Sequence, residues 1–259
     1  MQTIAIANHK GGVGKTATAH NLGSLLAEDG IRVLLVDTDP QASLTQTCGV
    51  GVLPEDTLSE VLGGSGPGSL KLKDIIVEID NGLYLAPAYI SLSTSELGLT
   101  SRLGRESVLR KALATVASNY DVCVIDCPPS LGLLTINALV GSDSALVPTQ
   151  PQAVDLRGLV LFLDTLNIIR AELNPDLEIL GVLITFFDGR LTHHKEAINV
   201  MKEAGIPLLD VYIGRSVRVA EAGATAQPVT NYEPKNPRSD EYKKLATEVK
   251  QWLKRNPKP

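Results

Sequence analysis

Short, continuous apolar runs alternate along the chain with longer stretches whose apolar residues recur at helical spacing. A continuous apolar run is typical of a strand buried on both faces, as in a parallel sheet that helices cover on each side. The expected strands are residues 2–8, 31–36, 83–86, 120–126, 144–148 and 177–187. The expected helices are residues 15–29, 57–62, 105–118, 131–140, 156–173, 191–204 and 239–253, and residues 92–103 are ambiguous. The pattern therefore predicts an α/β fold.

A glycine-rich turn follows the first expected strand, and a helix-forming run follows the turn. Glycines let the backbone curl until several N–H groups point at one spot, and the helix N-terminus adds its positive dipole end. The turn thus predicts a cradle for phosphate oxygens, in which Lys15 supplies a cation for the β- and γ-phosphates and Thr16 a hydroxyl ligand for Mg²⁺. The residues expected to contact the nucleotide here are Gly11, Gly12, Val13, Gly14, Lys15, Thr16 and Ala17.

Acidic residues stand at the ends of two further expected strands. Asp37 and Asp39 follow residues 31–36, and Asp126 ends residues 120–126. The carboxyl ends of parallel strands form the edge where α/β sheets bind ligands, so these carboxylates are expected beside the phosphate cradle. Asp126 is expected to hold Mg²⁺ through a water molecule, because Mg²⁺ keeps several of its waters in proteins. Asp37 could instead serve as a turn residue or a helix cap.

Residues 10–16, Lys-Gly-Gly-Val-Gly-Lys-Thr, resemble the deviant Walker A motif of the ParA/MinD class of P-loop ATPases. Residues 37–39 are similar to the switch I segment of that class, and residues 126–130 to its Walker B and switch II segments. His9 departs from the general P-loop pattern, which has glycine there. The resemblance covers nearly the whole chain. It implies one domain over residues 1–259, with a doubly wound, mainly parallel sheet and helices on both faces.

The resemblance also implies an activity, ATP hydrolysis with ATP and Mg²⁺ as cofactors. Its catalytic residues would be Lys10, Lys15 and Asp39. Lys10 would reach across a homodimer to the partner subunit's nucleotide, in the manner of an arginine finger. Lys15 would hold the triphosphate, and Asp39 would orient or activate the attacking water.

Two later segments are similar to the part of the family that surrounds the base. Residues 185–190 resemble the segment near the adenine, and residues 213–222 resemble the segment that closes over the base. Asp188 and Ile213 are therefore expected at the nucleotide. Gly214 stands where the family usually has proline, which loosens the loop. The two phenylalanines before Asp188 are expected in the core rather than on the base.

The same resemblance suggests a surface for DNA. Arg218 aligns with a DNA-contacting arginine of ParA proteins, and Arg215 and Lys250 are expected to extend a basic patch. The alternative for Arg218 is a surface ion pair with Glu221. The net charge of −5 counts against nucleic acid as a partner, unless a local patch overrules it.

Other features of composition narrow the class of protein. The three cysteines have no metal or disulfide spacing and indicate buried thiols in a reducing cytosol. No signal peptide is expected, and no apolar run reaches membrane-spanning length. His193 and His194 have no carboxylate or cysteine partners in the sequence, so they are interpreted as solvated rather than as metal ligands.

Four functions compete within the family. The favoured one is a partition ATPase whose ATP dimer binds nucleoid DNA non-specifically until a ParB-like protein stimulates hydrolysis, which places it in the cytoplasm on the nucleoid. A second is a similar ATPase that positions another intracellular cargo. A third is a membrane-surface ATPase like MinD, which needs a free C-terminal amphipathic helix, whereas residues 239–253 are expected to pack on the sheet. The fourth, a metabolic or redox enzyme, would need paired cysteines or a second substrate pocket.

Overall fold

The computed structural model describes residues 1–51, 56–64 and 70–257 of the chain. Within them, the strands form one eight-stranded sheet in the order β3-β4-β2-β5-β1-β6-β7-β8. The strands are β1 Gln2–Ile6, β2 Val33–Asp37, β3 Val77–Asp80, β4 Leu83–Ala86, β5 Val122–Asp126, β6 Ser144–Thr149, β7 Glu178–Phe187 and β8 Leu208–Gly214. Neighbouring strands are parallel except β3 and β4, which are antiparallel. The predicted doubly wound, mainly parallel sheet is confirmed.

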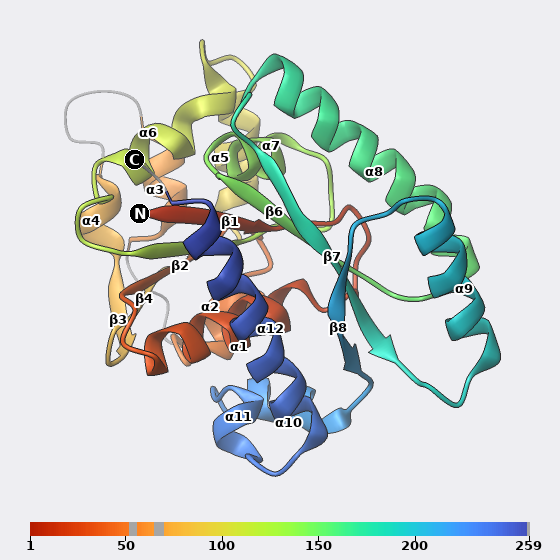
Figure 1. Cartoon of the computed structure of the whole chain (residues 1–259). Coiled ribbons are helices and arrows are strands. Elements are labelled where there is room, and N and C mark those ends of the chain that lie inside the picture. Colours follow the sequence, from red (N-terminus) through yellow and green to blue (C-terminus); the bar gives the residue numbers. More distant parts are fainter. Residues whose placement is uncertain (52–55, 65–69, 258–259) are drawn as a thin grey trace.

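Helices cover both faces of this sheet (Figure 1). The helices before β5 are α1 Lys15–Glu28, α2 Ser43–Thr47, α3 Leu58–Gly63, α4 Leu72–Ile75, α5 Leu92–Leu99, the 3-10 turn Arg105–Ser107 and α6 Val108–Ala114. Those after β5 are α7 Leu133–Val140, α8 Ala153–Glu172, α9 Thr192–Glu203, α10 Val217–Ala224, α11 Val229–Tyr232 and α12 Pro237–Arg255.

Each central strand sends alternate side chains into two separate cores. Ile4 and Ile6 of β1 pack among residues of α1 and α12, whereas Ala5 between them packs in the core that α7 and α8 cover. Leu34 and Leu35 of β2 divide in the same way. Because a strand with both faces buried has no polar face, its sequence reads as one continuous apolar run, as predicted.

Two strands were not predicted. The sequence placed the last core strand at residues 177–187, but Leu208–Gly214 forms a further strand, β8, at the edge of the sheet. Leu208 and Leu209 are half-buried and Asp210 is exposed, so the first half of the strand has no continuous apolar run. The short β3 alternates between half-buried and exposed residues, and it pairs antiparallel with β4 as the opposite edge.

The longer helices lie near their predicted positions, but the short helices α2, α10 and α11 were not predicted, and two predicted segments differ from the structure. Residues 105–118 were expected as one helix, but α6 spans Val108–Ala114 after a 3-10 turn. The ambiguous residues 92–103 contain α5, which ends at Leu99. The final helix is longer than expected, and its apolar face, including Leu245 and Val249, is buried against α1 and β8 as predicted.

Two expectations from composition can be compared with the fold. Cys48, Cys123 and Cys127 are buried and form no disulfide bond among the described residues, as expected. Across the helices of the described residues, none has both the length and the apolar character that crossing a membrane requires.

A buried amide joins the loop after α8 to the end of α7 and gives a test of the fold. The Asn174 side chain donates hydrogen bonds to the carbonyl oxygens of Leu139 (3.0 Å) and Ser142 (2.7 Å). We expect Asn174→Ala to lower the free energy of unfolding by about 2–4 kcal/mol, because two buried carbonyls lose their donor. Urea unfolding should measure this loss, and Asn199→Ala on the exposed side of α9 is the matched control. An equal midpoint for both variants would contradict the assignment.

Candidate nucleotide site

The turn between β1 and α1 forms the predicted cradle. Gly12 (φ 70°) and Gly14 (φ 84°) adopt left-handed backbone conformations, which residues with a side chain rarely tolerate. Gly14 is the N-cap of α1 and has no side chain to occupy the helix end, so the first N–H groups of the helix can serve an anion. The turn therefore has the geometry that a phosphate group requires.

Side chains from two other strands hold this turn in place. Asn8 donates to the carbonyl of Pro148 in β6 (2.8 Å), and the Thr185 hydroxyl in β7 lies 2.9 Å from the carbonyl oxygen of Val13. Gln150 donates to the carbonyl of Gly12 (2.9 Å). Sequence reasoning did not identify these supporting residues; the signals were a polar residue within apolar β7, Thr185, and polar residues just after β1 and β6, Asn8 and Gln150. They make the cradle rigid before any ligand binds.

Lys15 is buried at the start of α1. Its ammonium group donates to the carbonyl oxygen of Lys10 (3.0 Å), which curls the side chain back over the turn. Burial lowers the pKa of Lys15, and the nearby carboxylates Asp126 and Asp39 partly oppose that shift. A buried cation beside the cradle is placed to meet phosphate oxygens.

Thr16 and Asp126 meet at the carboxyl end of β5. The Thr16 hydroxyl donates to Oδ2 of Asp126 (2.7 Å), while Oδ1 of Asp126 is buried and has no hydrogen-bond partner. Burial, and then the charge of Asp37, raise the pKa of Asp126 well above its usual value. A hydroxyl and a carboxylate oxygen without a donor are hard ligands of the kind that Mg²⁺ prefers, so the pair fits this ion, held directly or through water.

Asp37 and Asp39 have different surroundings. Asp37 lies opposite Asp126 in the β2–β5 register and is fully buried. Its carboxylate accepts hydrogen bonds from the N–H of Asp39 (3.0 Å) and from the N–H and hydroxyl of Thr45 (2.8 Å each), and burial raises its pKa to about 6. Asp39 is half-buried and accepts from the N–H of Gln41 (2.9 Å). Asp37 thus shapes the turn that carries Asp39.

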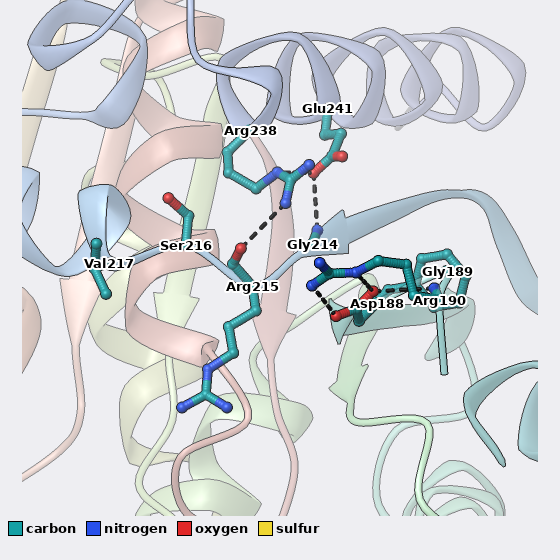
Figure 2. A pocket seen from close by; sticks show the side chains of 10 residues that line it. Asp188, Gly189, Arg190, Gly214, Arg215, Ser216, Val217, Arg238 and Glu241 are labelled. Atoms are coloured by element: carbon teal, nitrogen blue, oxygen red, sulfur yellow. Dashed lines mark hydrogen bonds and ion pairs between the residues drawn. The ribbon is translucent and has the colours of Figure 1, made fainter. Parts of the chain in front are cut away.

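A cavity of about 550 Å³ opens between the ends of β7 and β8 and the first turn of α12 (Figure 2). A second cavity, of about 430 Å³, reaches Gly12 of the cradle. Asp188 and Arg215 line both cavities, which are therefore neighbours. A nucleotide whose phosphates lie in the cradle has room for its sugar and base in this direction.

Comparison with known proteins agrees with this geometry. Residues 1–179 match the family described as AAA domain. The chain is 42% identical to the sporulation initiation inhibitor protein Soj of Bacillus subtilis, over 95% of this chain and 97% of Soj. It is 41% identical to the chromosome partitioning protein ParA of Caulobacter vibrioides, over 96% of this chain and 94% of that protein. The chain belongs to the ParA/MinD family of P-loop ATPases.

The same family likeness appears among solved structures. One described as cobyrinic acid a,c-diamide synthase from Mycobacterium smegmatis, with bound ATP analog and magnesium, has a TM-score of 0.82 and 36% identity, covering 98% of this chain and 96% of that one. The chain is an ATP hydrolase whose cofactors are ATP and Mg²⁺. Thr16 and Asp126 are the residues here that would hold the ion, and bound Mg²⁺ would neutralise phosphate charge.

One expectation about the base end of this ATPase stays a prediction, and another needs correction. The Ile213 side chain is buried in the core with α1 and α12, and the neighbouring Gly214 lines the cavity, so contact of Ile213 with the nucleotide stays a prediction. His194 is not solvated: it is buried, and its Nδ1 accepts the N–H of Asp188 (3.1 Å), whereas His193 is exposed. Helical spacing turns adjacent residues to different faces, which a paired reading of the two histidines missed.

The remaining residues at the base end agree better with the sequence. Phe187 packs edge-to-face on Tyr212, as a core residue would. The ring of Phe186 lies 3.6 Å from the point where Gly14 would carry a Cβ, so it touches the cradle. Asp188 lines the cavity, and an ion pair with Arg190 (2.7 Å) lowers its pKa, while its contact with the nucleotide stays a prediction.

The three residues expected to contact DNA have different partners in the structure. Arg218 forms ion pairs with Glu221 (2.7 Å) and Glu233 (3.4 Å), the first of which is the alternative that the sequence offered. Lys250 pairs with Asp29. Arg215 is exposed and lines the two cavities. The ion pairs give Arg218 and Lys250 structural partners, and they leave contact with DNA untested.

The unpartnered oxygen of Asp126 yields a test of the ion site. We expect Asp126→Asn to reduce the gain in ATP affinity that Mg²⁺ provides by about tenfold or more, because the ion loses an anionic ligand. In the unmodified chain this gain should fall as the pH is lowered, since protons compete with Mg²⁺ for a carboxylate whose pKa is raised. ATP binding measured with Mg²⁺ and with EDTA, at two pH values, checks both effects.

Asp121→Asn is the matched control, because Asp121 lies just before the same strand and pairs with Arg32 at the surface. It should leave the Mg²⁺ effect unchanged. A full Mg²⁺ effect in Asp126→Asn would place the ion elsewhere.

Proposed function

We propose that this chain is a partition ATPase whose ATP-bound homodimer binds DNA without sequence specificity. Hydrolysis, stimulated by a ParB-like protein, releases the DNA and moves a plasmid or chromosome, so the protein works in the cytoplasm on the nucleoid. The observation that supports this most is the 41% identity, over 96% of this chain, to a protein named for chromosome partitioning. We also propose that residues 1–259 act as one domain.

Two lysines in one phosphate loop support the dimer. Lys15 is already in place for the nucleotide of its own subunit, and its ammonium group is bound to the backbone of the turn. The backbone of Lys10 is fixed as well, because its N–H donates to Asn8 (3.0 Å) and its carbonyl accepts from Lys15. A second lysine at the start of the phosphate loop would act on the nucleotide of the partner subunit. There its charge would neutralise the negative charge that builds up during phosphoryl transfer.

The carboxylate of Asp39 is the proposed water-positioning group. Asp37 is buried and its oxygens hold the turn, so it is not available to a water near the γ-phosphate. Asp39 is half-buried, and it lies close enough to Lys15 to influence the pKa of that lysine. Water held there would attack in line with the phosphate in the cradle.

Two of the alternatives differ in what the ATPase attaches to, and one observation separates them. Positioning of another intracellular cargo uses the same site and the same DNA-bound dimer, so it differs only in the partner. A membrane-surface role needs an apolar helix face that is free to meet lipid. The apolar face of α12 is buried on α1 and β8, with Leu245 and Val249 fully covered, which disfavours membrane attachment through this helix.

A mixing experiment tests whether Lys10 acts in trans. Lys10→Ala and Asp39→Ala should each lose ATPase activity by about a thousandfold, because one removes the cation supplied in trans and the other removes the water-positioning group. Mixed in equal amounts, they should regain about a quarter of the normal activity, because half the dimers are mixed and carry one complete site. That site combines Asp39 of one subunit with Lys10 of the other.

If Lys10 acted within its own subunit, no mixed dimer would contain a complete site, and activity would not return. ATP binding by each variant alone is the control, since neither residue is proposed to be needed for it.

The DNA contact is tested by reversing one charge. Because the chain is acidic overall, DNA binding must depend on a local patch that the dimer presents twice. Arg218→Glu should weaken binding to unrelated duplexes equally, since phosphate contacts do not read sequence. The slope of log affinity against log salt should become shallower by about two units per dimer, from roughly 0.9 per lost phosphate contact.

Arg110→Glu makes the same charge change on α6 and serves as the control. Wild-type protein with ADP should bind DNA poorly. Unchanged DNA binding by Arg218→Glu at matched salt would move the patch to other residues.

A further inference from the structure

The end of β8 is fitted to the first turn of α12 at a position that has no side chain. A Cβ built on Gly214 would lie 2.5 Å from Cζ of Arg238, and its contact with Nη1 would be closer still. Real Cβ atoms do not approach other atoms so closely, so the guanidinium fills the space that a side chain at 214 would need. The backbone of Gly214 does not have a positive φ, so a side chain here would conflict with the position of the guanidinium, which would have to move, rather than with the backbone conformation.

Two side chains of α12 bind the backbone at this point (Figure 2). Glu241 accepts the N–H of Gly214 (2.8 Å), and the same carboxylate oxygen pairs with Nε of Arg238 (2.7 Å). Arg238 in turn donates through Nη1 to the carbonyl of Arg215 (3.2 Å). Both side chains are largely covered, with about a fifth of their surface exposed, so water competes little for these contacts. We call Gly214, Arg238 and Glu241 the clamp.

The clamp adjoins the cavity at the base end of the site. All three of its residues line the cavity of about 550 Å³, together with Arg215 and Asp188, which also line the cavity that reaches the cradle. The Arg215 side chain extends from the clamped backbone away from α12 (Figure 2). The clamp therefore fixes the wall past which the sugar and base of a bound nucleotide must lie, while the phosphate cradle is built from other elements.

We propose that Arg238 and Glu241 are positioning residues for ATP, which clamp the Gly214–Arg215 backbone to α12 so that this segment forms the wall of the nucleoside end of the site. In the clamp, the guanidinium occupies the space that a Cβ at residue 214 would take. This inference rests on ATP binding and is independent of the partition role, so failure of DNA or partner binding would not affect it.

The first test separates the two ends of the ligand. Arg238→Ala should weaken ATP binding by about tenfold, because the wall loses two charge-assisted contacts. Binding of inorganic tripolyphosphate, which has no sugar or base, should stay within about twofold, since the cradle is untouched. Arg238→Lys keeps the charge but cannot make both contacts, so it should resemble Arg238→Ala. Arg255→Ala, at the far end of α12, is the matched control for ATP.

The second test uses the close contact itself. Gly214→Ala should displace the guanidinium and weaken ATP binding about as much as Arg238→Ala does. In the double variant Gly214→Ala with Arg238→Ala, the added methyl group has room. The double variant should therefore bind ATP about as weakly as Arg238→Ala alone. Gly98→Ala adds a methyl group on α5 where no atom lies within 4 Å, and it should leave ATP binding unchanged.

Three results would overturn the proposal. Arg238→Ala and Arg238→Lys could both bind ATP as the wild type does. Tripolyphosphate binding could fall as much as ATP binding, which would mean that the arginine acts on the cradle or on the fold. The losses from Gly214→Ala and Arg238→Ala could simply add, which would show that the two residues are not coupled. Thermal unfolding of each variant shows that a loss of binding is measured on folded protein.

Discussion

The site depends on two carboxylates that the sheet buries next to each other. Asp37 and Asp126 end adjacent parallel strands, lie opposite each other in the register, and are almost fully covered. Burial raises the pKa of each, the charge of Asp37 raises the pKa of Asp126 further, and the charge of Asp39 raises the pKa of Asp37. Two buried like charges are costly unless cations neutralise them. Lys15 is one such cation, and Mg²⁺ would be the other. Binding of MgATP would therefore relieve the electrostatic repulsion between the two buried carboxylates.

The two acids meet this cost in different ways. Asp37 is surrounded by three donors from its own switch segment, so its charge orders the turn through Thr45. Asp126 receives one donor, from Thr16, and keeps a buried oxygen without a partner. An incompletely satisfied carboxylate is a poor structural element and a good ligand. Stability and function are thus divided between neighbouring strands: the first acid holds the loop, and the second is left ready for the ion.

The sequence predicted the parts of the fold whose cause is local. Continuous apolar runs identified the central strands because burial on both faces leaves no polar position, and the run of glycines identified the cradle. Prediction failed where the cause lay across the fold. The edge strand β8 has a broken apolar pattern, and His194 is buried by its neighbours. Residue type alone does not reveal which face of an edge strand meets a ligand.

The chain path beyond β8 links the nucleotide end of the site to the proposed DNA surface. The clamped backbone of Gly214 and Arg215 runs directly into Ser216, whose hydroxyl caps α10 by accepting the N–H of Arg218 (3.2 Å). The next turn of α10 holds the guanidinium of Arg218 through Glu221, and Glu233 beyond α11 adds a second ion pair. A segment this short, fixed at its start by α12, leaves little freedom between the cavity wall and Arg218. The Ser216 cap therefore joins the clamped backbone directly to the helix that bears Arg218.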